Sequence, residues 1–406
     1  MLILLFIIAL FMKQTIHLLL LIFSLHTNCS GQPPLSGKIT LAPDTKWAPT
    51  LFLIQPRSLD EVATNFLGQV IDSAQVKADG SFVFENLPDS PVPMLLELAV
   101  QKKGEQFVNR LNNENPGSDN YCPIIWKNGF KLKISASISQ FQSSFSIENP
   151  SPENAALLKL RDIRQSAFQQ FLSKNKNEEH EEAKLLEAEA AKLNFQKPLI
   201  DFAQQTDQLL PALLAIRWVS PNQDYERIPE FLFSQCQKWK SSHPGHPWVA
   251  QLCQKSNRER LPVLIGDQLP EARLPMLAGD TLTLTQLIGK RRLTLLDLWA
   301  SWCAPCRREN RDYLVPLWEQ HHKNGFEIIG YALDASAQAW KKAIEADGAY
   351  RWVHASHLRG DDAPLMEALR IQTIPANFLL DAEGKVIAKN LHGEALLKFV
   401  AEYLGE

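Results

Sequence analysis

The chain has 406 residues, of which 45% are hydrophobic and 21% charged, and its formal net charge is −3. This length predicts two or three domains, and the balanced composition is typical of a globular protein. The small negative charge and the lack of basic runs interleaved with aromatic residues argue against polyanion binding, so we expect no nucleic-acid partner.

Residues 1–29 are predicted to form a signal peptide. Read from Met12, which we take as the true start, the segment has a short basic beginning, an apolar core and then a cysteine. Residues 26–29 resemble a degenerate lipobox with Cys29 as the lipidated residue. The alternatives are a retained membrane anchor and an ordinary secreted protein cut nearby. Both the lipidated and the secreted form place the other thiols in an oxidising compartment.

Residues 36–147 have the pattern of a β-rich domain. Short β-prone runs with alternating apolar residues indicate strands with one buried face. The predicted strands include residues 38–41, 50–54 and 130–138. Residues 75–84 contain two alternating segments around Asp79-Gly80, which predicts a hairpin. The expected product is a small antiparallel sandwich without catalytic side chains, which serves as a scaffold or docking surface.

Residues 151–257 are predicted to be helical. Ser151 with the following proline offers a helix start, and the apolar spacing after it fits a helical face. An acidic run around His180 is interpreted as a solvated helix face, and the pair His243 and His246 as a loop, so no metal site is expected. Cys236 and Cys253 either pair or stay buried as free thiols, and Cys122 is left over if Cys29 carries lipid.

Strands and helices alternate from residue 262 to the end of the chain. This order implies parallel pairing through crossovers, and a closing hairpin adds antiparallel partners. The predicted strands are 293–299, 326–333, 377–381 and 385–389. The predicted helices begin at Cys303 and cover 335–346, 363–370 and 394–403.

Cys303 and Cys306, two residues apart, follow the first of these strands at the start of a helix. Dithiol–disulfide exchange requires this arrangement, because one thiolate attacks and a neighbour must resolve the mixed disulfide. The alternatives are a permanent disulfide or half of a zinc site. Zinc takes four ligands, and no second C-x-x-C occurs in the sequence. We expect a redox-active Cys303–Cys306 disulfide and no metal or other cofactor.

The segments 302–309 (WCAPCRRE), 373–375 (TIP) and 378–381 (FLLD) resemble the thioredoxin superfamily, and within it the exported TlpA/ResA-type disulfide reductases. The resemblance covers residues 262–406. It implies an α/β thioredoxin-like domain with a central mixed sheet flanked by helices. The β-rich and helical regions before it resemble the extension of Bacteroidetes-type lipoproteins with an AhpC/TSA-type thioredoxin domain.

The resemblance implies a role for each residue of the motif. Cys303 is the expected nucleophile, because backbone N–H groups and the dipole at a helix start favour a thiolate. Cys306 is the resolving thiol. The buried acid that assists proton removal from it corresponds by spacing to Asp297, whose alternative is an exposed position at the strand end. Burial would raise the pKa of that carboxyl.

The resemblance also implies a substrate groove formed by Trp302, Pro305, Ile374 and Pro375, with Pro375 in the cis form. Arg311 replaces a frequent proline, from which we expect a straighter helix. Two further features of the motif are less specific. Glu309 either steers the thiol pair electrostatically or lies on a solvated helix face. The arginines at 307 and 308 are expected to face water.

The sequence therefore predicts an exported, lipid-anchored thiol–disulfide oxidoreductase of the cell envelope, acting chiefly as a reductase. Its expected partners are oxidised client proteins, such as apocytochromes c before haem attachment, a membrane-embedded electron donor, and the membrane itself. The alternatives are a disulfide isomerase or oxidase, a non-enzymatic envelope binding protein, and a peroxiredoxin-like peroxidase. The peroxidase needs a Thr-x-x-Cys nucleophile, whereas Ala300 stands at the threonine position.

Overall fold

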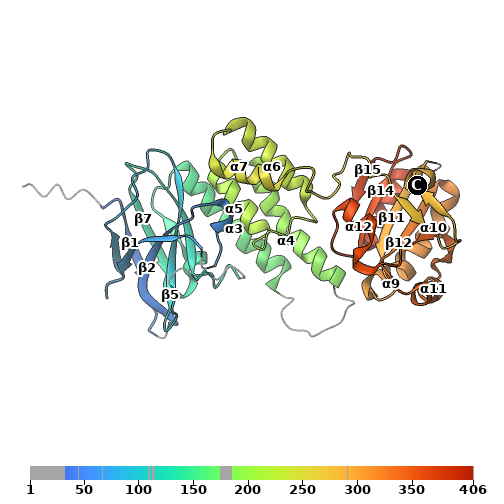
Figure 1. Ribbon diagram of the computed structural model, residues 1–406. Helices are drawn as coiled ribbons and strands as arrows, with labels where there is room; N and C mark the ends of the chain where they lie inside the picture. Colours follow the sequence, from blue (N-terminus) through green and yellow to red (C-terminus); the bar gives the residue numbers. More distant parts are fainter. Residues whose placement is uncertain are drawn as a thin grey trace, which may run out of the picture.

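The computed structural model describes residues 33–43, 45–65, 67–107, 110–111, 115–173, 185–289 and 291–405. The predicted signal peptide with Met12 and Cys29, and also His180, lie outside these residues. Figure 1 shows an elongated molecule in which a β-rich part, a group of helices and an α/β part follow one another in chain order. The α/β part carries the C-terminus.

The β-rich part is a sandwich of two four-stranded sheets, as far as the chain is described. One sheet has the order β4-β1-β7-β8 and the other β3-β2-β5-β6. Alternate residues of β7 are buried, as the sequence pattern predicted. The strands are β1 (Leu35–Thr40), β2 (Trp47–Gln55), β3 (Gln69–Gln75), β4 (Ser81–Phe84), β5 (Met94–Lys102), β6 (Tyr121–Trp126), β7 (Leu132–Ser137) and β8 (Ser146–Ile147).

Two details of the predicted sandwich are wrong. The Asp79-Gly80 turn forms, with the Gly80 N–H donating to the Lys77 carbonyl at 2.8 Å, but it does not close a hairpin. Strand β3 stays paired with β2, whereas β4 crosses to the other sheet and pairs with β1. The sandwich is also not wholly antiparallel, because β1 and β7 run parallel. Local turn chemistry specifies the turn but not the sheet that each strand joins.

The middle of the molecule is helical, as predicted. Its helices are α3 (Pro152–Phe171), α4 (Leu185–Gln205), α5 (Leu209–Val219), α6 (Pro229–Ser242) and α7 (Pro247–Lys255), and the short α2 (Phe141–Ser144) precedes them. Helix α3 begins where predicted, because the Ser151 side chain accepts the N–H of Asn154 and Pro152 occupies the first turn. A disulfide joins Cys236 of α6 to Cys253 of α7, while Cys122 is a buried free thiol.

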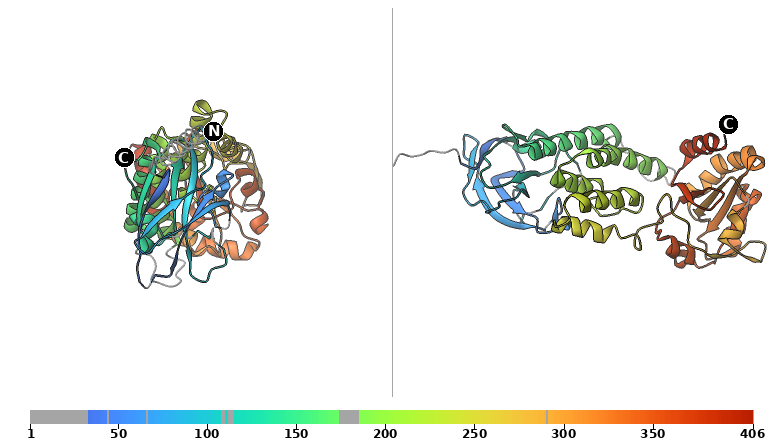
Figure 2. Two further views of the ribbon diagram at one scale, coloured as in Figure 1. Left: turned by 90° about the vertical axis from the view of Figure 1, so that its left-hand side faces the viewer. Right: turned by 90° about the horizontal axis from the view of Figure 1, so that it is seen from above.

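The helices share a hydrophobic core with one face of the sandwich. Ile54, Leu95 and Ile125 of the strands pack in one cluster with Leu160 and Leu213 of the helices. A second cluster fills the space between the two sheets. Because apolar burial is the main stabilising term in folding, we expect the sandwich and the helices to unfold together. Figure 2 shows the helices in a row between the sandwich and the α/β part.

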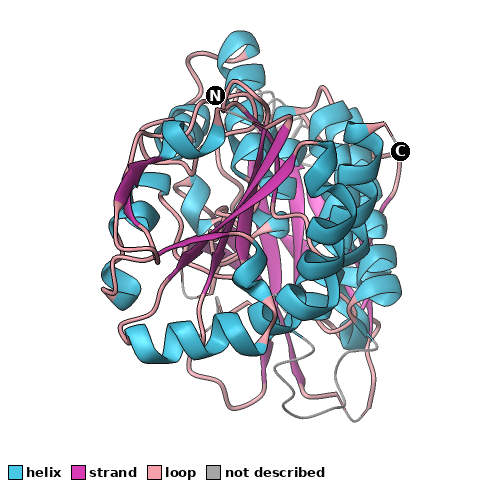
Figure 3. Cartoon of the chain, turned by 90° about the vertical axis from the view of Figure 1, so that its right-hand side faces the viewer, coloured by secondary structure: helices cyan, strands magenta, loops and turns pink. Residues whose placement is uncertain are grey.

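The α/β part has a central mixed sheet with helices on both faces (Figure 3), which confirms the predicted fold class. The strand order is β13-β12-β11-β14-β15, with β11 parallel to β12 and antiparallel to β14. These strands are β11 (Leu293–Trp299), β12 (Phe326–Ala332), β13 (Val353–Ala355), β14 (Ala376–Leu380) and β15 (Val386–Lys389), and a small hairpin of β9 (Arg273–Pro275) and β10 (Thr281–Thr283) precedes them.

Strand β11 is buried along its whole length, as expected for a central strand covered on both faces. The helices of this part are α8 (Leu284–Ile288), α9 (Ala304–Glu309), α10 (Val315–His321), α11 (Ala337–Ala346), α12 (Pro364–Leu369) and α13 (Gly393–Leu404). A π-helical segment, Asn310–Leu314, separates α9 from α10. The expectation of a straighter helix at Arg311 is therefore wrong, since π-helical turns interrupt the regular hydrogen-bond ladder.

The α/β part has a core of its own and meets the helices through polar contacts. Its hydrophobic cluster is separate from that of the sandwich and helices. At the junction, the Lys389 ammonium lies 2.7 Å from the Glu230 carboxylate and also donates to the Val263 carbonyl. The Glu230 carboxylate in turn accepts the N–H of Ile265. None of the helices described here is long and apolar enough to cross a bilayer.

Candidate active site around the Cys303–Cys306 disulfide

The two cysteines form a disulfide at the point where strand β11 passes into helix α9. Cys303 is the N-cap residue of α9, and its sulfur accepts the N–H of Cys306 at 3.3 Å. Pro305 occupies the first turn of the helix, where a proline costs no hydrogen bond. In the reduced protein the same N–H and the helix dipole would stabilise a Cys303 thiolate. The structure therefore places the predicted nucleophile at the predicted helix start.

Asp297 lies inside β11, in register with Gly330 of β12 and Asn377 of β14. Its side chain is buried rather than exposed at the strand end. Burial, and secondly the neighbouring Glu309 carboxylate, raise the pKa of Asp297 well above its ordinary value. A carboxyl with a raised pKa lies closer to a thiol in acidity, so proton exchange between the two groups is easier.

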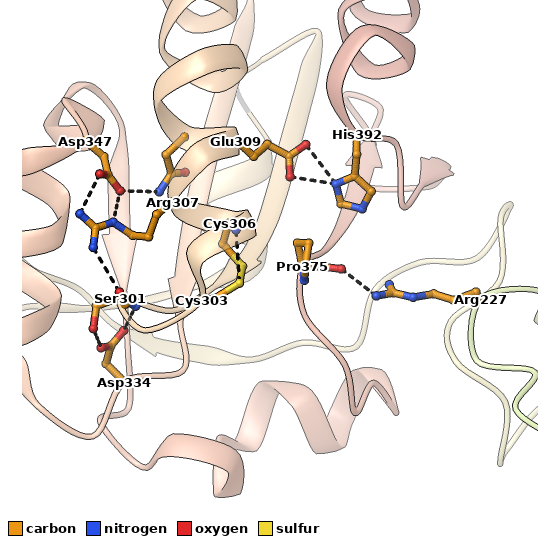
Figure 4. The surroundings of a disulfide bond; sticks show 11 residues. Arg227, Ser301, Cys303, Cys306, Arg307, Glu309, Asp334, Asp347, Pro375 and His392 are labelled. Carbon is orange, nitrogen blue, oxygen red and sulfur yellow. Dashed lines mark hydrogen bonds and ion pairs between the residues drawn. A yellow bond between two sulfur atoms is a disulfide. The ribbon is translucent and has the colours of Figure 1, made fainter. Parts of the chain in front are cut away.

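Glu309 is buried at the end of α9 and pairs with a histidine from a distant part of the chain. Nδ1 of His392 lies 2.8 and 3.0 Å from the two carboxylate oxygens. His392 is the residue before α13. Figure 4 shows this pair beside the disulfide. Of the two interpretations of Glu309, the structure excludes the solvated helix face.

Two aspartates hold the loop before Cys303. The Asp334 carboxylate accepts both the N–H of Ser301, at 3.0 Å, and its hydroxyl. The buried Asp347 accepts from the Arg307 guanidinium, which also donates to the Ser301 carbonyl at 3.1 Å. The expectation that Arg307 faces water is therefore wrong, because its charge is paired with Asp347 across the helix start (Figure 4).

The residues predicted to form a groove come from two segments, one at the disulfide and one at the cis peptide bond. The Ile374–Pro375 peptide bond is cis, as the resemblance implied. Figure 4 shows Pro375 facing the cysteines. Trp302, directly before Cys303, exposes 59% of its surface, and Ile374 is half-buried. An exposed aromatic residue beside a reactive group provides apolar contact area for a partner.

Comparison with known proteins finds relatives of the α/β part. The Redoxin family model matches residues 264–397. The solved thioredoxin domain of a thiol-disulfide oxidoreductase from Bacteroides vulgatus is 32% identical over 35% of this chain and 99% of its own, with a TM-score of 0.33. Thiol-disulfide oxidoreductase ResA of Oceanobacillus iheyensis is 32% identical over 147 residues, which are 35% of this chain and 72% of that protein.

The chain belongs to the thioredoxin superfamily as a ResA-like protein. ResA of Bacillus thuringiensis subsp. konkukian is 28% identical over 34% of this chain and 76% of its own length. Thiol:disulfide interchange protein DsbE of Pseudomonas fluorescens biotype C is 32% identical over 30% of this chain and 64% of its own. The chain is thus similar to thiol–disulfide oxidoreductases, and oxidoreductase activity follows from the family.

Sequence reasoning missed several residues around the ResA-like disulfide. His392, Asp334 and Asp347 follow the motif by tens of residues, so their contacts are long-range and no local pattern indicates them. Glu226 and Arg227 belong to the helical region, from which the sequence predicted no residue of the redox site. The sequence contains one indication of these contacts. Glu309 lies one helical turn after Cys306, and a carboxylate that is not solvated requires a partner.

Proposed function

We propose that the chain is a thiol–disulfide reductase that uses Cys303 and Cys306 to reduce disulfides of exported client proteins. The observation that carries this proposal is the position of the Cys303 sulfur, which accepts a backbone N–H at a helix start and is disulfide-bonded to Cys306. An attacking thiolate with a resolving thiol one turn away is what exchange chemistry requires.

The reaction begins with the reduced protein. The Cys303 thiolate attacks one sulfur of the client disulfide, forming a mixed disulfide and releasing the other client sulfur as a thiolate. The Cys306 thiol loses its proton, for which Asp297 is the proposed acceptor, and attacks the Cys303 sulfur. The second client thiolate leaves, and the Cys303–Cys306 disulfide forms. Two electrons pass from the protein dithiol to the client, and no cofactor takes part.

The proposed location is the cell envelope, with a lipid anchor at Cys29 and a membrane-embedded electron donor that regenerates the dithiol. The apolar leader followed by residues 26–29 supports this location. The Cys236–Cys253 disulfide also supports it, because structural disulfides persist in oxidising compartments. Apocytochromes c with oxidised haem-binding cysteines are the clients that we propose on the basis of the resemblance.

Insulin reduction tests the proposed activity. With dithiothreitol as electron source, the protein should accelerate reduction of oxidised insulin, and Cys303→Ser should abolish the acceleration. Cys306→Ser should accumulate a mixed disulfide at Cys303, visible by non-reducing electrophoresis. Cys122→Ala, which removes a thiol outside the pair, is the matched control and should behave like wild type.

Three results would reject or redirect the proposal. Insulin reduction by Cys303→Ser at the wild-type rate would remove the nucleophile from the mechanism. Reactivation of scrambled ribonuclease that outpaces insulin reduction would favour an isomerase. Finally, the absence of any trapped client for Cys306→Ser in the envelope, together with a stable partner captured by the amino-terminal regions, would favour the binding protein.

A further inference from the structure

Two residues of the helical region contact the loop that faces the disulfide. Glu226 and Arg227 lie between α5 and α6, far from the redox motif in sequence. The Glu226 carboxylate accepts the N–H groups of Gln372 and Thr373, at 3.1 and 3.2 Å, and the Thr373 hydroxyl at 2.6 Å. One acidic side chain thus holds the segment that leads into the cis peptide bond.

Arg227 holds the other end of the same loop. Its guanidinium donates to the Pro375 carbonyl at 2.8 Å and to the Asn390 side-chain oxygen at 2.9 Å. Its Nε lies 2.9 Å from the Glu189 carboxylate of α4, and its side chain is only 14% exposed. Figure 4 shows Arg227 reaching Pro375 from outside the α/β part. Charge-assisted hydrogen bonds of this kind are the stronger ones in proteins.

The two contacts lie on either side of Ile374 and leave its backbone unused. No described residue hydrogen-bonds to the N–H or the carbonyl of Ile374. Ile374 precedes the proline that faces the disulfide (Figure 4), and Trp302, directly before Cys303, is exposed. A free N–H and carbonyl in a half-buried loop form an open edge to which an extended polypeptide can add by backbone pairing.

We propose that Glu226 and Arg227 are positioning residues that fix the 372–375 loop for backbone pairing with an extended client polypeptide, so that the helical region forms part of the client-binding site. The proposal rests on the proposed reductase function. The resemblance to the family already implies pairing of this segment with an extended client, and what the proposal adds is the support of the loop by the helical region. Clients that present the disulfide within an extended segment use the loop, whereas a small disulfide does not need it.

The nature of the junction explains why such contacts are needed. The α/β part and the helices do not share a hydrophobic cluster, and interfaces between domains that are small and polar permit relative motion. Without the two residues, the loop would have to be ordered by the client itself, and that ordering weakens binding. Binding rather than the chemical step should therefore be affected.

The test compares two disulfide substrates, oxidised insulin and glutathione disulfide, with full-length wild type and with Glu226→Ala and Arg227→Ala. For insulin, each of the two alanine variants should have a KM about tenfold higher than wild type, which is the change expected from loss of one charge-assisted hydrogen bond. The kcat should be unchanged. The rate constant for glutathione disulfide should not change. Glu226→Gln, which keeps an acceptor oxygen, should give an intermediate KM. Arg57→Ala, which removes an exposed arginine of the sandwich, is the matched control.

Each other outcome contradicts the proposal in its own way. An unchanged insulin KM in both alanine variants would show that the loop needs no support, and a lower KM would show that the two residues block the groove. Equal losses with insulin and with glutathione disulfide would indicate damage to the disulfide site itself. If wild type reduced neither substrate, the reductase function would fail first. Binding of fluorescent oxidised insulin to the Cys303→Ser, Cys306→Ser protein, with and without Arg227→Ala, measures the affinity without turnover and should weaken by the same factor.

Discussion

At the scale of single residues, Asp297 is the group that links burial to redox chemistry. Burial raises its pKa, and the Glu309 carboxylate adds to the shift. The Glu309 carboxylate is paired with His392. Its position near Asp297 therefore depends on a contact with the start of α13. The raised pKa brings this carboxyl closer to a thiol in acidity, which favours proton exchange between the two groups.

Asp297→Asn should therefore slow insulin reduction by about tenfold or more at neutral pH, because general acid–base assistance is lost. The rate of the wild type should rise with pH as Asp297 ionises, and this step should be missing in the variant. The measurement is the rate of insulin reduction between pH 5 and 9. Asp361→Asn, on an exposed turn, is the control, and superimposable profiles for wild type and Asp297→Asn would exclude the role.

Glu97 gives a prediction about stability. It is buried in β5, accepts the N–H of Ala63 at 2.7 Å, and has its pKa raised by burial to about 8, while the nearby Arg217 charge acts in the opposite direction. A carboxyl with a raised folded-state pKa is protonated in the folded protein and ionised in the unfolded chain. Stability is therefore highest below the unfolded pKa, near 4.5, and falls as the pH rises towards 8.

Glu97→Gln should remove this loss, because the amide keeps the acceptor for Ala63 and never ionises. The free energy of unfolding of the variant should exceed that of the wild type by a few kcal/mol at pH 8.5, since one pKa unit corresponds to about 1.4 kcal/mol. The two proteins should differ little at pH 4. Urea unfolding at both pH values measures the difference, and an equal difference at both would contradict the raised pKa.

At the scale of elements, the strand–loop–helix unit around the disulfide follows from local sequence, and its surroundings do not. The apolar run of β11 and Pro305 after Cys303 are sufficient to predict a buried strand and a helix start. Arg307 carries no local sign that its charge is paired with Asp347, 40 residues later. The turn at Gly80 shows the same limit: its local conformation was predicted correctly, but the pairing of the strands on either side was not.

Asp347 gives a prediction at this scale, because it ties three residues of the helix after Cys303 to the end of α11. It accepts from Arg307, Asn310 and Arg311, and its side chain is fully buried. Asp347→Ala should lower the stability of the α/β part by about 2–4 kcal/mol, because removing one partner of a buried ion pair leaves the other charge without its partner. The partial exposure of the two arginines moderates this loss.

Thermal unfolding followed by tryptophan fluorescence measures this loss of stability. Asp362→Ala, on an exposed turn, is the matched control. Equal stability of Asp347→Ala and wild type would mean that Asp334 alone holds the loop before Cys303. A loss limited to stability, with normal insulin reduction by the folded variant, is expected, since Asp347 does not touch the sulfur atoms in any of the described contacts.

At the scale of the whole molecule, the hydrophobic clusters fall into two bodies, and this division separates the roles of the parts. One cluster is shared by the sandwich and the helices, a second fills the sandwich, and a third belongs to the α/β part alone. The contacts between the two bodies include ion pairs and hydrogen bonds, such as those of Glu230 with Lys389 and Ile265. Sequence alone placed the boundary close to residue 260, but the polar character of the junction depends on side chains that meet only in the folded chain.

Two bodies joined by polar contacts, the sandwich with the helices and the α/β part, should unfold in two steps, which calorimetry can resolve. Leu213→Ala creates a cavity in the cluster shared by the helices and the sandwich, and Phe378→Ala creates one in the α/β core. Each loss is expected to reach about 3 kcal/mol, which for a unit of this size lowers the Tm by roughly 5–10 °C. Leu213→Ala should shift one transition and Phe378→Ala the other. If either variant shifted both transitions equally, the molecule would be a single cooperative unit, and the polar junction would then couple the redox site rigidly to the sandwich.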